Sequence, residues 1–155
     1  MSDPTLEPPA RQTPTPTVAF TVRPIGIVRT THRKSARCHR YFVPRGRATL
    51  ELFRPYLPGI QGLYPGVELW ITTYHAPSGR LPADSWQGAE NVPGVFATNS
   101  IERPNPIEFL RARVLELHPE SGLIRVEGLD VEDGAPILDI RPVTSPHHRM
   151  ARPGE

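Results

Sequence analysis

Proline is the residue that most constrains what this chain can fold into. The 155 residues include 20 prolines and 12 glycines, together about a fifth of the chain. A proline inside a helix removes a backbone donor and clashes with the preceding turn. Because the prolines are spread along the sequence, a large helix bundle is excluded. Only residues 54–62 favour a helical turn, which Pro55 and Pro58 keep short.

Hydrophobic and polar residues alternate over much of the chain, which is the period expected of strands with one buried face. With turn-forming Gly and Asp clusters between the strands, the pattern predicts an all-β fold of about seven strands. We expect them at 20–29, 48–53, 67–75, 94–98, 110–118, 123–127 and 135–141. The predicted architecture is a small closed or nearly closed β-barrel with little helix, because closure leaves no open sheet edges.

The two ends of the chain differ from this central part. Residues 1–18 contain five prolines and almost no large apolar side chains, so we expect a disordered Pro-rich arm. Residues 144–155 are similar in composition and are expected to form a flexible tail. His147 and His148 are adjacent in this polar tail, so we expect them to be solvated and not to bind a metal. The predicted organisation is therefore one barrel domain, residues 19–143.

Composition also restricts the compartment. No apolar run approaches the ~20 residues that cross a bilayer, and the first residues lack a secretory signal. Cys38 is the only cysteine, which excludes an internal disulfide and a multi-cysteine metal site. We therefore expect a cytoplasmic protein without membrane contact and without a metal.

Charge is divided unevenly along the chain. Nine basic residues and one acidic residue lie between Arg23 and Arg54, whereas four basic and eleven acidic residues lie between Asp84 and Asp139. A dense basic block is typical of a protein that binds a phosphate-bearing partner such as nucleic acid. The alternative is that the two halves neutralise each other across the fold or across a dimer contact.

Several motifs of catalysis are absent from the sequence. There is no dinucleotide-binding glycine fingerprint, no P-loop, no nucleophile elbow and no zinc-binding helix motif. Cys38 and His39 could pair as nucleophile and base, but neighbours on a strand point to opposite faces. A Rossmann-type cofactor site is therefore unsupported.

Two segments combine rigid backbone with polar side chains. Residues 94–109 (GVFATNSIERPNPIEF) hold an Asn between two prolines, which is either a rigid ligand-binding element or simply a stiff connection. Residues 128–142 (GLDVEDGAPILDIRP) place carboxylates in a turn and in the strand that follows. Asp139 faces away from Leu138 and Ile140, and is expected to be exposed or paired with Arg141. The alternative to a functional site is that this segment forms an ordinary turn with a surface ion pair, which contributes little.

Together, GVFAT-x-S-x-x-RPNPI and the LD-x-x-DG-x-P-x-LDI-[KR]-P unit resemble the TsaA-like (YaeB/TrmO) family of S-adenosylmethionine-dependent methyltransferases, over about residues 22–142. The resemblance implies a β-barrel that dimerises and binds S-adenosylmethionine without a Rossmann fold. The best-characterised members methylate the exocyclic amine of threonylcarbamoyl-adenosine beside the tRNA anticodon. The expected function is the same transfer to a modified adenosine in tRNA, by a homodimer.

The resemblance also implies which residues form the site. The expected cofactor-binding residues are His39, Arg40, Tyr41, Tyr74, His75, Asn99, Arg103, Asn105, Phe109, Glu127, Gly128, Leu129 and Asp130. A base within hydrogen-bond reach would take the proton of the acceptor amine. The candidates for this catalytic role are Asp139, Asp130 and His75, among which the sequence does not choose.

The chain departs from the family pattern at three places. Asn99 stands where the family usually has Arg, Glu108 stands where it usually has Gly, and residues 85–93 lack the usual basic residues. The C-terminal extension of the longer tRNA-modifying members is also expected to be missing. Two alternatives therefore stay open: an S-adenosylmethionine-binding module without catalysis, and a methyltransferase of small metabolites.

Overall fold

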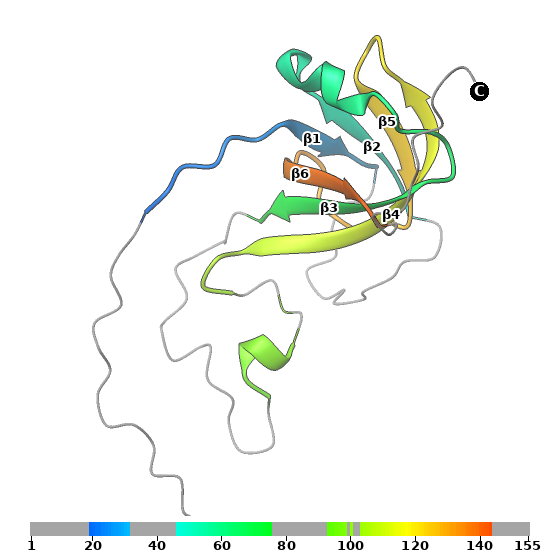
Figure 1. The fold of residues 1–155 in the computed structure, drawn as a ribbon. Coiled ribbons are helices and arrows are strands. Elements are labelled where there is room, and N and C mark those ends of the chain that lie inside the picture. The colour runs from blue at the N-terminus through cyan, green and yellow to red at the C-terminus, as the bar shows by residue number, and fades with distance from the viewer. Residues whose placement is uncertain (1–18, 32–45, 76–92, 99, 101–102, 144–155) are drawn as a thin grey trace, which may run out of the picture.

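The computed structural model describes residues 19–31, 46–75, 93–98, 100 and 103–143. Its elements are six strands and two short 3-10 helices (Figure 1). In chain order they are β1 (Gly26–Arg29), β2 (Arg47–Leu52), η1 (Arg54–Ile60), β3 (Glu68–Tyr74), η3 (Val95–Ala97), β4 (Ile107–His118), β5 (Leu123–Glu127) and β6 (Pro136–Pro142).

The strands close into a barrel in the order β1-β2-β5-β4-β3-β6, and every neighbouring pair is antiparallel. The closing pair, β1 with β6, is the shortest, with Gly26 opposite Ile137 and Ile27 opposite Pro136. β4 is long enough to pair with β3 through its first half and with β5 through its second half, and it bends at Leu115 where the register shifts. The predicted all-β barrel is confirmed.

Inward-facing apolar residues that alternate with outward-facing ones fill the barrel interior. On the central strands Leu50, Ile71 and Ile124 are fully buried, while Thr49, Thr72 and Arg125 face outward beside them. Fifteen buried hydrophobic residues form one contiguous core. Burial of apolar surface of this kind is the main favourable contribution to folding.

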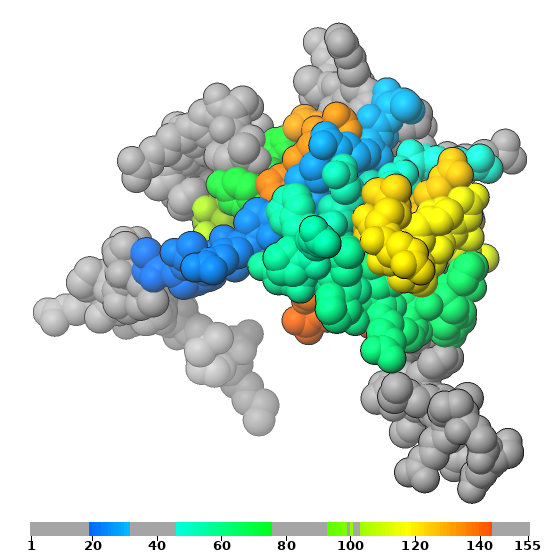
Figure 2. Space-filling model, turned by 90° about the horizontal axis from the view of Figure 1, so that it is seen from above, coloured from blue at the N-terminus to red at the C-terminus, as the bar shows by residue number. Residues whose placement is uncertain are grey.

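The helix η1 covers one end of the barrel. It confirms the short helical turn predicted in residues 54–62. Its buried Ile60 joins the core, and Leu57 packs against that core. Figure 2, which looks onto this end, shows η1 beside the turn between β4 and β5. The backbone N–H of Leu52, the last residue of β2, donates to the carbonyl of Gly122 in that turn (2.9 Å), which holds the end of β2 against the turn.

Two expectations about strands were wrong. Residues 94–98 form a single 3-10 turn, so the described residues contain six strands instead of seven. The N–H groups of Ala97 and Thr98 bond to carbonyls three residues earlier, and only Val95 in η3 is buried. A short apolar run does not by itself distinguish a buried strand from a helical turn.

The first strand is also shorter than expected. Residues 19–25 are described without strand structure, and β1 begins only at Gly26. Pro24 has no N–H to donate to a neighbouring strand, and Phe20 and Val22 are exposed. Strand pairing therefore starts where both β2 and β6 come within reach.

The expected arm (residues 1–18) and tail (residues 144–155) lie outside the described residues. Within the part of the chain that is described, no helix is long and apolar enough to cross a membrane.

Candidate functional site

The antiparallel order brings three long connections to the same end of the barrel. Neighbouring strands run in opposite directions around the ring, so the connections β1–β2, β3–β4 and β5–β6 all leave from one end. The connections β2–β3 and β4–β5 lie at the other end, which η1 covers. Most of the candidate site residues belong to the first set of connections, although they are far apart in sequence.

The β5–β6 connection (residues 128–135) contacts both of the others. Asp133 accepts a hydrogen bond from the backbone N–H of Thr30 (3.0 Å), and Gly128 donates its N–H to the carbonyl of Gly46 (2.8 Å). Glu132 lies 3.9 Å from Nδ1 of His75, at the start of the β3–β4 connection. The three connections therefore form one continuous surface.

A small hollow of about 140 Å³ opens where these segments meet. It is lined by Tyr74, His75, Glu108, Val131, Glu132, Asp133, Gly134, Ala135 and Pro136. The side chain of His75 is only 16 % exposed, and its backbone N–H is held by the carbonyl of Pro106 (2.9 Å). Tyr74 and His75, both expected to bind the cofactor, are thus neighbours in one polar hollow.

Glu108 was not among the expected site residues, yet it lines this hollow. It pairs in register with Thr73, which is fully buried, so both side chains point into the barrel. The hydroxyl of Thr73 donates to Oε2 of Glu108 (3.4 Å). The sequence signal was the two-residue spacing to Leu110 and Ala112, which places Glu108 on the inward face of β4.

The remaining residues of the β5–β6 connection lie at the rim. Leu129 and Val131 insert into the core and close this end of the barrel. Asp130, between them, is half-buried, and Glu127 ends β5 opposite Arg47 and Arg113. Gly128 adopts φ = 92°, a left-handed conformation that favours glycine.

Arg103 and Asn105 belong to the segment that leads into β4. The Arg103 guanidinium donates to the carbonyls of Val95 (3.1 Å) and Thr98 (2.8 Å) and lies over the Phe96 ring, 5.8 Å from its centroid. Arg103 therefore holds the η3 turn together. Figure 1 shows η3 standing apart from the barrel wall.

Phe109 and Asp139 lie on the outer wall of the barrel and do not line the hollow. Both are opposite Thr72 in the sheet, one on β4 and the other on β6. Phe109 is 71 % exposed. Asp139 accepts a hydrogen bond from Nε of Arg141 (2.6 Å), the ion pair that its position in the sequence suggested.

The other candidates cannot be placed. His39, Arg40, Tyr41 and Asn99 lie outside the described residues, as does Cys38. Among the residues that are described, no group of three or more His, Cys, Asp or Glu side chains is arranged to hold a metal ion.

Ion pairs neutralise much of the outer wall. Hydrogen bonding to Arg111 and, to a smaller extent, Arg113 holds the pKa of Glu68 below its usual value. Hydrogen bonding to Arg125, with His118 nearby, lowers the pKa of Glu116 in the same way. Both carboxyl groups are therefore ionised at neutral pH and occupy the neighbouring guanidinium groups.

These features define a class of protein: a small closed antiparallel barrel that gathers polar side chains from three connections at one open end. Residues 27–147 match the family model of the tRNA-methyltransferase O N-terminal domain. The chain belongs to this family, which confirms the assignment made from the two sequence motifs.

Relatives of known name share this region. The chain is 30 % identical over 138 residues to the tRNA (adenine(37)-N6)-methyltransferase of Escherichia coli, an alignment that covers 80 % of this chain and 57 % of that protein. It is 29 % identical over 124 residues to a Methanothermobacter thermautotrophicus protein named "Probable S-adenosyl-L-methionine-binding protein", covering 78 % of this chain and 88 % of that one. The crystal structure of TrmO from Pseudomonas aeruginosa superposes with a TM-score of 0.60 at 27 % identity, over 89 % of this chain and 62 % of that chain.

The extent of these matches varies with the relative. The chain spans 34 % of the length of an Archaeoglobus fulgidus relative to which it is 28 % identical, and less than two thirds of the Escherichia coli and Pseudomonas aeruginosa proteins. The activities and substrates of those longer proteins therefore support only a proposal about this chain.

Proposed function

We propose that this protein is an S-adenosylmethionine-dependent methyltransferase that methylates the exocyclic amine of a modified adenosine in tRNA. The observation that carries the proposal is the family match over residues 27–147, which includes the barrel strands apart from Gly26 and all three connections that meet at the open end of the barrel. The Escherichia coli relative, named for methylation of adenine 37 of tRNA, supports the substrate.

The described residues suit part of the proposed methyl donor. S-adenosylmethionine carries a positive sulfonium and a positive amino group, and the hollow offers the carboxylates of Glu108 and Glu132 beside the Tyr74 ring. Carboxylates and aromatic faces both attract cations. At about 140 Å³ the hollow is smaller than the roughly 300–1,000 Å³ typical of whole ligand sites. We propose that it holds one end of the donor, while residues of the β1–β2 and β3–β4 connections hold the rest.

When bound, S-adenosylmethionine supplies a methyl group activated by its sulfonium charge. The role of the protein is to hold the acceptor amine in line with that group, and such alignment can contribute ~7 kcal/mol or more in ideal cases. Glu108 and Tyr74 would attract the positive charges of the donor in the hollow. The buried Thr73 hydroxyl donates to the Glu108 carboxylate and holds it in place. His75 is the candidate that accepts the proton of the acceptor amine.

His75 is favoured over the other two candidate bases by its position. It lines the hollow, whereas Asp139 lies on the outer wall in an ion pair and Asp130 lies at the rim. We expect His75→Gln to lower the rate of methyl transfer by about 100-fold or more, the usual contribution of a general base. Single-turnover rates of His75→Gln, Asp130→Asn and Asp139→Asn show which of the three substitutions slows methyl transfer most. A larger loss in Asp139→Asn would exclude the assignment.

Methyl transfer can be measured directly with purified protein. Isotope-labelled S-adenosylmethionine is incubated with tRNA from cells in which the gene has been deleted, and the nucleosides are separated by mass spectrometry. We expect the label in one adenosine derivative of the tRNA. We also expect calorimetry to detect binding of the donor to the protein in the absence of tRNA. No heat at millimolar donor would exclude the methyltransferase proposal.

The same assay separates the alternatives. Glu108 lines the hollow at the position where the family usually has glycine, and a side chain that keeps the acceptor out would leave a binding module without catalysis. Donor binding without transfer to RNA, protein or small metabolites would identify such a module. Label in a small metabolite alone would identify a metabolite methyltransferase.

A homodimer and a cytoplasmic location complete the proposal. Trp70 (42 % exposed) and Phe109 (71 % exposed) lie near each other on the outer wall of β3 and β4. Aromatic residues are enriched at protein–protein interfaces, so this exposed pair supports a dimer. The proposed tRNA substrate supports a cytoplasmic location.

A further inference from the structure

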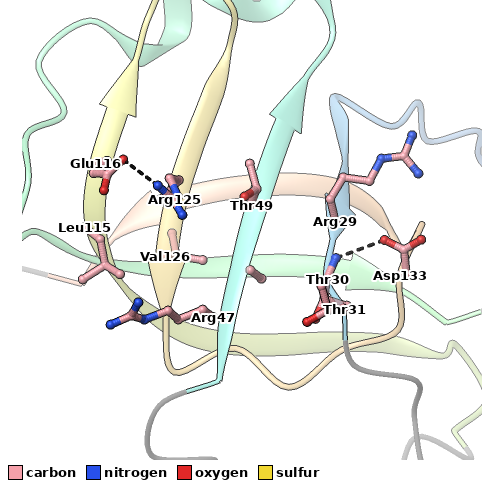
Figure 3. A pocket seen from close by; sticks show the side chains of 11 residues that line it. Arg29, Thr30, Thr31, Arg47, Thr49, Leu115, Glu116, Arg125, Val126 and Asp133 are labelled. Atoms are coloured by element: carbon pink, nitrogen blue, oxygen red, sulfur yellow. Dashed lines mark hydrogen bonds and ion pairs between the residues drawn. The ribbon is translucent and has the colours of Figure 1, made fainter.

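A second, larger hollow lies on the outer wall of the barrel and shares only Asp133 with the hollow described above. This groove has a volume of about 580 Å³ and is lined by the end of β1, by β2, β4 and β5, and by Asp133 (Figure 3). Its lining residues are Arg29, Thr30, Thr31, Arg47, Ala48, Thr49, Leu115, Glu116, Arg125, Val126 and Asp133. Neither the candidate residues of the hollow nor the family motifs account for it.

The strand register explains why polar residues meet there. Thr49 of β2 is opposite Arg29 of β1 and opposite Arg125 of β5, and Arg125 is in turn opposite Glu116 of β4. These residues alternate with buried core positions, so they form one outward row across four strands. The register shift between Val114 and Glu116 bends β4 beside this row. The bend in β4 lies at one side of the groove.

Three arginines (Arg29, Arg47 and Arg125) and two carboxylates (Glu116 and Asp133) line the groove. Arg29 pairs with Glu51 (3.0 Å) and Arg125 pairs with Glu116 (3.0 Å), but both pairs are about half exposed. Such exposed pairs contribute little to stability, so a phosphate can replace the carboxylate at small cost. No carboxylate among the described residues forms an ion pair with Arg47, although Glu127 is its neighbour across the sheet.

Two further features point to a long anionic ligand. Thr31 and Arg47 line the groove, and the sequence between them contains five more basic residues, namely Arg33, Lys34, Arg37, Arg40 and Arg45. Asp133 lines both the groove and the hollow that contains His75. The groove therefore reaches the edge of the proposed methyl-donor site, so a chain of phosphates lying in it would pass that site.

We propose that this groove binds the phosphate backbone of the RNA substrate, with Arg47 as its main contact. Arg29 and Arg125 exchange their carboxylate partners for phosphate oxygens, and the hydroxyls of Thr31 and Thr49 provide neutral hydrogen-bond donors. This inference rests on the proposed function, because it specifies how the same protein holds its RNA. Arginine suits the task, since its planar group can contact a phosphate through two hydrogen bonds.

The test compares groove variants with a matched variant on the opposite wall. Arg47→Ala, Arg47→Glu and the double variant Arg47→Ala/Arg125→Ala are compared with Arg111→Ala, which removes the same charge from an exposed ion pair on the face of β3 and β4. Binding of a fluorescent anticodon stem-loop RNA is measured by anisotropy at several salt concentrations. Calorimetry with S-adenosylmethionine and thermal unfolding are recorded for each variant.

We expect the groove variants to bind RNA several-fold more weakly than wild type, with Arg47→Glu the weakest of the single variants. The salt dependence, the slope of log affinity against log salt, should decrease by about one for each phosphate contact removed. Donor binding, thermal stability and the RNA affinity of Arg111→Ala should remain as in wild type.

Three results would overturn the groove assignment. They are equal RNA binding by wild type and the groove variants, an equal loss in Arg111→Ala, and displacement of RNA by polyglutamate as readily as by unlabelled RNA, which would indicate an acidic protein partner. These results leave donor binding and methyl transfer intact, and so differ from failure of the proposed function, in which no methyl is transferred. Wild type that binds no RNA would overturn both the groove and the tRNA substrate.

Discussion

Replacing Ile124 with alanine is expected to lower the free energy of unfolding by about 2–5 kcal/mol. Ile124 is fully buried at the centre of β5, opposite Leu50 on one side and Leu117 on the other. Truncation removes apolar contacts and leaves a cavity that a closed barrel cannot collapse around, because its strands are hydrogen-bonded on both sides. Urea unfolding followed by circular dichroism measures the change.

The neighbouring residue gives the matched control. Arg125 points outward from the same strand and pairs with Glu116 at the surface. Arg125→Ala should therefore cost only roughly 0–1 kcal/mol. Equal losses in the two variants would mean that the alternation of β5 does not determine what the barrel buries. A protein with a total stability of about 5–15 kcal/mol would lose a large fraction of it in Ile124→Ala.

Replacing Gly122 with alanine should destabilise the protein through two separate effects. Gly122 adopts φ = 73° in the turn between β4 and β5, a conformation that costs an L-residue roughly 1–2 kcal/mol. An added Cβ would also lie 2.3 Å from Cδ2 of Leu57 and 3.0 Å from the carbonyl oxygen of Leu52. The end of the Leu57 side chain must then rotate away and the Leu52 carbonyl must shift slightly, which adds a cost of about 1 kcal/mol, the low end for overpacking.

Gly62→Ala separates the two effects. Gly62 also has a positive φ, 90°, but an added Cβ there would meet nothing within 4 Å. It should therefore show the conformational cost alone, and the difference between the variants measures how tightly η1 packs against the β4–β5 turn. If thermal and urea unfolding show the same loss for both glycines, η1 does not pack on that turn as the structure has it.

Much of the barrel could be predicted from the sequence, because alternation is a local property of a strand. The bounds expected for β5, residues 123–127, are those observed, and β2 and β3 differ by a residue at their ends. Residues 94–98 were misassigned because their backbone is satisfied by local bonds and by Arg103, which no periodicity reveals.

The candidate site was predicted less completely. The family motifs predicted Tyr74 and His75, which line the hollow, and Phe109, which lies on the outer wall, and the roles of all three stay predictions. Glu108 was recognised only as a departure from the family pattern, although its place on the inward face of β4 brings it to the hollow. Whether a strand residue faces the site depends on register and bending, and both involve a second strand.

The sequence by itself determined that the chain forms short strands separated by turns, which residues lie inside, and to which family it belongs. These are consequences of proline placement, of alternation and of local motifs. Only the tertiary structure decided that residues from three distant connections share one end of a barrel, and that Arg29, Arg47 and Arg125 line one groove. The physical reason is that ring closure and strand register depend on hydrogen bonds between segments far apart in the chain, which no local pattern specifies.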